Sequence, residues 1–268
     1  MADYYFLVNP GRDIYSEVNI CRFVSNRLKK SIQEPEFKLF VYTQKAEENR
    51  WQVVDEVYFN GESNIQLRST DYDLDVGSIA VIVTAELNDV SAEYSHTLMD
   101  PFSRKIDFSI VADRSAISFH RGAGFSSYQG EFPHQMSKIK GTFLGFDPLV
   151  QRNCGSVDSV LVFVNIFSQS LQVKENFTFV VASADTRKII STHSYTHNSA
   201  AIIPVASLDD GAKVFYSKDT LGVPIFLSYE NGFDGNVTVE HTHPPAELFM
   251  GKLEGQRAIK ANWLSVLP

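Results

Sequence analysis

Two short stretches decide the fold class: Phe37-Lys-Leu-Phe-Val-Tyr-Thr43 and Phe177-Thr-Phe-Val-Val-Ala-Ser183. In both, apolar side chains alternate along the stretch and a hydroxyl residue ends it. Neighbouring side chains of a strand point to opposite faces, so a period of two indicates β-structure. Similar stretches, separated by Asn, Asp, Gly and Pro, occur at residues 4–8, 51–59, 64–69, 78–85, 106–111, 160–167, 189–197, 201–207, 213–217, 224–229 and 236–243. The sequence therefore predicts an all-β chain.

The composition limits the size and the partners of this chain. Its 268 residues exceed the roughly 100–150 residues of a usual domain. A net charge of −8 disfavours binding to nucleic acid and to anionic membranes. Two cysteines are too few for a disulfide framework, and the first ten residues lack the pattern of a secretory signal. We therefore expect a cytoplasmic protein.

A faint internal repeat predicts how the strands are grouped. Five residues of the first half, at positions 60, 65, 67, 69 and 71, align at a constant offset with residues 198, 203, 205, 207 and 209. Residues 107–111 fall opposite residues 236–240. The repeat predicts two tandem β-sandwich (jelly-roll-like) domains, at residues 1–118 and 155–268. Residues 119–154, rich in glycine and aromatic residues, are expected to connect the two domains and to pack across both.

The strongest candidate for chemistry is the stretch Gly235-Asn-Val-Thr-Val-Glu-His-Thr-His-Pro-Pro-Ala-Glu247. In a strand, His241 and His243 share one face with two valines, and the following prolines end the strand so that Glu247 can fold back. Two imidazoles and one carboxylate are a common ligand set for zinc, iron or manganese. In the first half, the aligned positions hold Ala112, Arg114 and Ser118, none of which completes such a set.

This stretch resembles the first metal motif of the cupin β-barrel family. The resemblance rests on Gly235, His241, His243, Glu247 and Gly255, and it covers about twenty residues. It implies that the two histidines and the glutamate bind a divalent metal. The second cupin motif, which supplies a third histidine, is absent, because residues 256–268 contain no histidine.

Further histidines are candidates for the missing ligand. His134 is the first choice, and His193 and His197 are the others. His193, Tyr195 and His197 share one strand face, which we expect to be an exposed polar face rather than a ligand set.

Two functions from different classes remain open. The first is a divalent-metal protein, either a binding protein or an enzyme that acts on a small molecule or carbohydrate. Its metal ligands are His241, His243, Glu247 and His134, and no catalytic residue is assigned. The second is a non-catalytic tandem β-sandwich that binds a glycan, a peptide or a protein. A separate expectation concerns residues 160–167, whose apolar run predicts a central strand.

Overall fold

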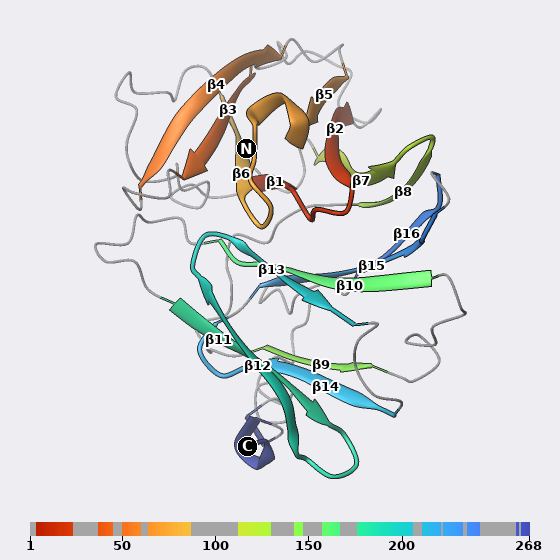
Figure 1. Cartoon of the computed structure of the whole chain (residues 1–268). Helices are drawn as coiled ribbons and strands as arrows, with labels where there is room; N and C mark the ends of the chain where they lie inside the picture. Colours follow the sequence, from red (N-terminus) through yellow and green to blue (C-terminus); the bar gives the residue numbers. More distant parts are fainter. Residues whose placement is uncertain are drawn as a thin grey trace. The chain divides into compact units, whose positions relative to one another are not determined.

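The fold is that of a computed structural model, which describes residues 4–23, 37–44, 50–59, 64–86, 112–129, 142–146, 157–166, 176–205, 211–220, 222–232, 235–241, 261–262 and 264–268. These residues form sixteen β-strands in four sheets of four strands (Figure 1). The all-β prediction is confirmed. Within this part of the chain, no helix has the length and apolarity needed to cross a lipid bilayer.

The chain divides into two compact units. Unit 1 comprises Met1–His134 and Phe167–Val173, and unit 2 comprises Gln135–Ile166 and Lys174–Pro268. The range predicted as a connecting segment, 119–154, contributes a strand to each unit. Strand β8 (Gly124–Gln129) pairs with β7 (Ala112–Arg121) of unit 1, and β9 (Thr142–Phe146) pairs with β14 (Lys213–Ser217) of unit 2.

Unit 1 has the sheet orders β1-β6-β3-β4 and β5-β2-β7-β8. A short 3-10 helix, Ser69–Tyr72, follows β5. The strands are β1 (Tyr4–Val8), β2 (Tyr15–Phe23), β3 (Phe37–Gln44), β4 (Trp51–Phe59), β5 (Ile65–Arg68), β6 (Ile79–Glu86), β7 (Ala112–Arg121) and β8.

Unit 2 has the sheet orders β12-β11-β14-β9 and β13-β10-β15-β16. The strands are β9, β10 (Val157–Val164), β11 (Asn176–Ser183), β12 (Ile189–Thr196), β13 (Ala200–Pro204), β14 (Lys213–Ser217), β15 (Val223–Glu230) and β16 (Val237–His241). Strand β10 lies between β13 and β15, so the predicted central position of residues 160–167 is confirmed for the part that the structure describes.

The two units have the same strand order. When every strand number of unit 1 is raised by eight, both of its sheet orders become those of unit 2. This correspondence supports the internal repeat, whose origin by duplication stays a prediction. It also makes β8, rather than residues 107–111, the counterpart of β16; residues 107–111 lie outside the described part of the chain.

Each unit buries apolar side chains between its two sheets. In unit 2, Phe163 of β10 packs against Phe179 of β11, with ring centroids 4.8 Å apart. In unit 1, Ser16 of β2 joins the two sheets, because its Oγ accepts a hydrogen bond from the Val8 backbone nitrogen at 2.7 Å and donates one to the Val8 carbonyl oxygen at 2.8 Å. Ser16, and with it Val18 and Ile20, therefore faces the interior of unit 1.

Candidate functional site

The predicted metal ligands lie almost wholly outside the described residues. His241 is the last residue of β16, and its backbone lies opposite Ile225 of β15. His243, Glu247 and His134 fall on segments that the structure does not describe. Among the residues that it does describe, no group of three or more His, Cys, Asp or Glu side chains could hold a metal ion. The metal site stays a prediction.

The valines that precede His241 do share one face, but that face points away from the core of unit 2. Val239 and Val237 lie opposite Leu227 and Tyr229 of β15. The core cluster takes Phe226 from the alternate positions of the same strand. A site built on this row would therefore lie on the outer face of the sheet.

The expectation of an exposed polar face at His193, Tyr195 and His197 is wrong. Cross-strand partners share a face, and Tyr195 lies opposite Phe177, a fully buried core residue. His197 is buried, and its Nδ1 lies 3.0 Å from Oδ1 of Asn165. This histidine belongs to a buried polar contact between the ends of two strands.

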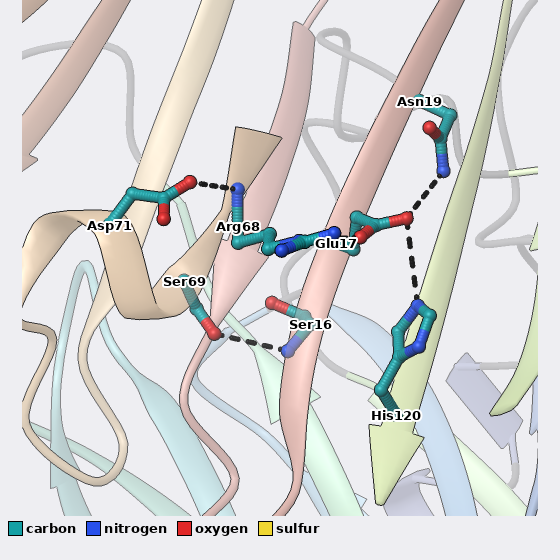
Figure 2. Close-up of polar contacts among 7 residues, drawn as sticks. All are labelled: Ser16, Glu17, Asn19, Arg68, Ser69, Asp71 and His120. Atoms are coloured by element: carbon teal, nitrogen blue, oxygen red, sulfur yellow. Dashed lines mark hydrogen bonds and ion pairs between the residues drawn. The ribbon is translucent and has the colours of Figure 1, made fainter. Parts of the chain in front are cut away.

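A different cluster forms on the outer face of the β5-β2-β7-β8 sheet in unit 1, with Glu17 at its centre (Figure 2). Glu17 is only 3% exposed. Its Oε2 accepts a hydrogen bond from Nε of Arg68 at 2.8 Å, and its Oε1 accepts one from Nδ2 of Asn19 at 2.9 Å. Nε2 of His120 lies 3.6 Å from Oε1, which is too long for a hydrogen bond but allows an ion pair when the imidazole is protonated.

Strand pairing explains why these side chains meet. Glu17 of β2 lies opposite Arg68 of β5, and Asn19 lies opposite Gln66. Residues two apart in a strand share a face, so Tyr15, Glu17 and Asn19 point outward while Ser16 points inward. The helix that follows β5 holds Arg68 in place, because its backbone nitrogen donates to Oδ2 of Asp71 at 3.0 Å.

The electrostatics of this cluster favour the ionised carboxylate. Burial raises the pKa of Glu17, since it disfavours the charged form. Hydrogen bonds from Gln66, Arg68 and Asn19, together with the nearby His120, outweigh that effect, so the pKa of Glu17 lies below its usual range. The result is a buried carboxylate paired with a half-exposed guanidinium, whose side chain is 46% exposed.

Three stacked rings adjoin the carboxylate. His120 of β7 lies between Tyr15 of β2 and Phe125 of β8, its partners in the strand register. The centroid of the His120 ring is 4.9 Å from that of Tyr15, with 7° between the planes, and 5.3 Å from that of Phe125, with 20° between them. Phe125 lies on the edge strand of the sheet and is 65% exposed. The stack therefore ends in an accessible ring.

We call this set of outward-facing residues the polar face. Its members come from all four strands of the sheet: Tyr15, Glu17, Asn19, Gln66, Arg68, Ser118, His120, Phe125 and Ser127. Of these, Gln66, Arg68, Phe125 and Ser127 are exposed. The buried Glu17 and the largely buried His120 position their neighbours and contribute little surface of their own.

The corresponding face of unit 2 is chemically different. Strands β7 and β15 end at Arg121 and Glu230, and aligning these ends places Val160 at the position of Glu17 and Pro204 at that of Arg68. We call this set the aliphatic face, because all of its members except Asp158 and Tyr229 are aliphatic: Asp158, Val160, Val162, Ile202, Pro204, Leu227, Tyr229, Val237 and Val239. Val160 is 2% exposed and Leu227 is fully buried. The strand arrangement alone therefore does not require a carboxylate at this position.

Sequence reasoning missed the polar face. The only signal in the sequence was the alternation in Tyr15-Ser-Glu-Val-Asn-Ile20, where Ser, Val and Ile point inward and Tyr, Glu and Asn point outward. That signal identifies a strand, but it does not reveal the partner of Glu17.

Comparisons with known proteins do not assign the chain to a family. No family model matches it. No curated protein matches it either. One solved structure that it resembles weakly is that of tripeptidyl peptidase 2 (TPP II), with 12% sequence identity and a TM-score of 0.23. The alignment covers all of this chain and 26% of that one. A similarity of this size carries no argument about fold or function.

Proposed function

We propose that this chain is a binding protein whose recognition surface is the polar face of unit 1. The observation that carries the proposal is the contrast with unit 2, where the same strand arrangement carries Val160 and Pro204 at the positions of Glu17 and Arg68. An ion pair with one buried member, as Glu17 is here, is often no more stabilising than apolar residues of similar volume, because burial of the charge opposes the attraction. The polar face is therefore better explained by recognition than by folding.

Geometry supports a binding role for these residues. Glu17 fixes the side chains of Arg68 and Asn19 through hydrogen bonds of 2.8 and 2.9 Å. His120, which is itself stacked on Tyr15, fixes Phe125 by stacking. Groups held in one conformation before binding lose less entropy when a ligand arrives, so a supported surface binds more tightly than a mobile one.

A direct test is to map ligand contacts by nuclear magnetic resonance on ¹⁵N-labelled protein, with a library of saccharides, short peptides and small aromatic compounds. Compounds that bind should shift the amide signals of β2, β5, β7 and β8, and Phe125→Ala should weaken them. The matched control is Ile189→Ala, which removes a side chain 50% exposed in unit 2. The proposal would be contradicted if a ligand shifted only the amide signals of unit 2, or if Phe125→Ala left its affinity unchanged.

The metal-binding function remains a separate proposal and rests on the cupin-like spacing of His241, His243 and Glu247. If a zinc, iron or manganese ion is held there, it would polarise an oxygen of a small-molecule substrate or activate water. The two proposals are compatible, because the polar face belongs to unit 1 and the histidines belong to unit 2.

A further inference from the structure

The charge balance of the polar face disfavours an anionic ligand. Its one guanidinium, that of Arg68, already binds Glu17, and the Arg68 backbone nitrogen binds Asp71. The chain as a whole carries a net charge of −8. A phosphate, sulfate or uronate would therefore meet a compensated cation in a negative field. A cationic ligand gains little as well, because the Glu17 carboxylate is buried and occupied.

The exposed part of the polar face combines a flat apolar group with neutral polar groups. The Phe125 ring is backed by His120, so its accessible surface has a fixed orientation at the edge of the sheet. Ser127 is two residues along the same strand, and Gln66 is exposed on β5. Such a surface suits a ligand with an apolar ring face and many hydroxyl groups. A neutral sugar has that chemistry, because its axial C–H groups pack on an aromatic ring while its hydroxyls bind amides and other hydroxyls.

The extent of the face indicates the length of the ligand. Phe125 lies on β8 and Gln66 on β5, at opposite edges of a four-stranded sheet. Neighbouring strands lie about 4.8 Å apart, which gives about 14 Å across the sheet. Phe125 lies level with Tyr15 and Gln66 level with Asn19, four residues further along β2, so the two side chains are separated by about 20 Å in all. A single sugar ring cannot contact both, whereas a short oligosaccharide can.

We propose that the polar face of unit 1 binds a neutral oligosaccharide, with one sugar ring packed on Phe125 and with hydroxyl contacts to Ser127, Gln66 and the exposed part of Arg68. This inference rests on the proposed binding function and names its ligand class. Glu17 and His120 act as positioning residues, since each reaches the ligand through a neighbour.

The experiment is a glycan array probed with the whole chain, followed by isothermal titration of the best neutral oligosaccharide, its monosaccharide unit and an acidic oligosaccharide of the same length. We expect the neutral oligosaccharide to bind, the monosaccharide to bind more weakly and the acidic compound to be rejected. Phe125→Ala should weaken binding about fivefold, because an aromatic contact is worth about 1 kcal/mol. Phe125→Tyr should retain binding, Gln66→Ala should weaken it, and Ile189→Ala should leave it unchanged.

The possible failures are distinguishable. If acidic glycans or peptides bind the polar face and neutral oligosaccharides do not, the ligand class is wrong while the proposed binding function stands. If none of these compounds binds the polar face, both proposals are wrong. If a ligand binds but neither Phe125→Ala nor Gln66→Ala weakens it, both proposals are wrong. Phe125 is 65% exposed and Gln66 is exposed, so neither substitution should prevent folding.

Discussion

The outer faces of two equivalent sheets show what this strand arrangement requires and what it leaves free. In unit 1 that face holds Glu17, Arg68 and a stack of three rings; in unit 2 it holds Val160, Pro204 and mainly aliphatic residues, with Asp158 and Tyr229 as the exceptions. Inward-facing positions of the two sheets stay similar, for example Ser16 and Ser159, which are both buried. The strand order therefore constrains the core and tolerates opposite chemistry outside it.

The difference between the two faces also indicates which of them has a role beyond packing. Aliphatic residues on a buried face need only apolar neighbours, so they report packing. A buried carboxylate must find hydrogen bonds, and Glu17 receives them from residues on neighbouring strands. Buried charged groups are uncommon in protein interiors unless they are paired. The polar face is therefore a place where the sequence departs from what folding alone favours.

The largest effect should come from moving the carboxylate into unit 2. Val160→Glu places a charge at a position that is 2% exposed and has Pro204 and Leu227 as its cross-strand partners. An uncompensated buried charge costs about 3–5 kcal/mol, so we expect a loss of that order in the free energy of unfolding of unit 2. Urea denaturation with hydrogen exchange of β10 and β15 peptides measures it. Val160→Ile is the control, and equal stability of the two variants would show that the aliphatic face tolerates charge.

The next largest effect tests whether unit 2 binds a metal at the end of β16, where unit 1 has no histidine. In the register, Gln129 of β8 occupies the position that corresponds to His241. If the predicted site binds, zinc or manganese at a hundred times its dissociation constant should stabilise the chain by about 2.7 kcal/mol. His241→Ala and His243→Ala should remove this stabilisation and the bound metal, and His96→Ala should not. Elemental analysis of chelator-free protein that finds no metal after incubation would reject the site.

A smaller effect follows from the lowered pKa of Glu17. A carboxyl whose pKa is depressed by folding adds stability above its unfolded pKa of about 4.3, and this stability is lost as the pH falls through the folded pKa. The free energy of unfolding of unit 1 should therefore decrease as the pH is lowered from about 5. In Glu17→Gln this part of the pH dependence should be missing. An identical pH profile for the variant would show that Glu17 does not titrate differently in the folded state.

The sequence predicted the strand type and most strands, but not the polar face. Alternation identifies strands locally, so β1, β3, β4 and β14 begin where predicted. Strands β2, β7, β8 and β9 were missed; in β2 the outward positions are polar, so no clear apolar run marks the strand. Contact between Glu17 and Arg68 crosses 51 residues and depends on the β2–β5 register, which a single sequence does not specify.

The internal repeat illustrates the same limit. The sequence aligned Ile65 with Ile203, whereas the strand register makes Leu67 the counterpart of Ile203, since they lie opposite Val18 and Leu161. A shift of two residues keeps every side chain on its face, so the pattern of apolar residues cannot detect it. The sequence thus indicated that the two halves have similar strands, but it did not give the correct residue-by-residue alignment.

The smallest expected effect bears most directly on the comparison. Replacing Glu17 by Val and Arg68 by Leu gives unit 1 the apolar character that unit 2 has at these positions. Both partners of the ion pair are removed together, so no charge is left unpaired. Asn19 and Gln66 lose the acceptor that Glu17 provided, but neither is buried. The free energy of unfolding should therefore change by no more than about 1 kcal/mol or should increase. Ligand binding by the polar face should be lost in the same variant. A large loss of stability would instead mean that the pair holds unit 1 together, and the polar face would then need no ligand to explain it. The single variant Arg68→Leu separates the two cases further, because it leaves the buried Glu17 carboxylate without its cation and should destabilise unit 1 more than the double variant does.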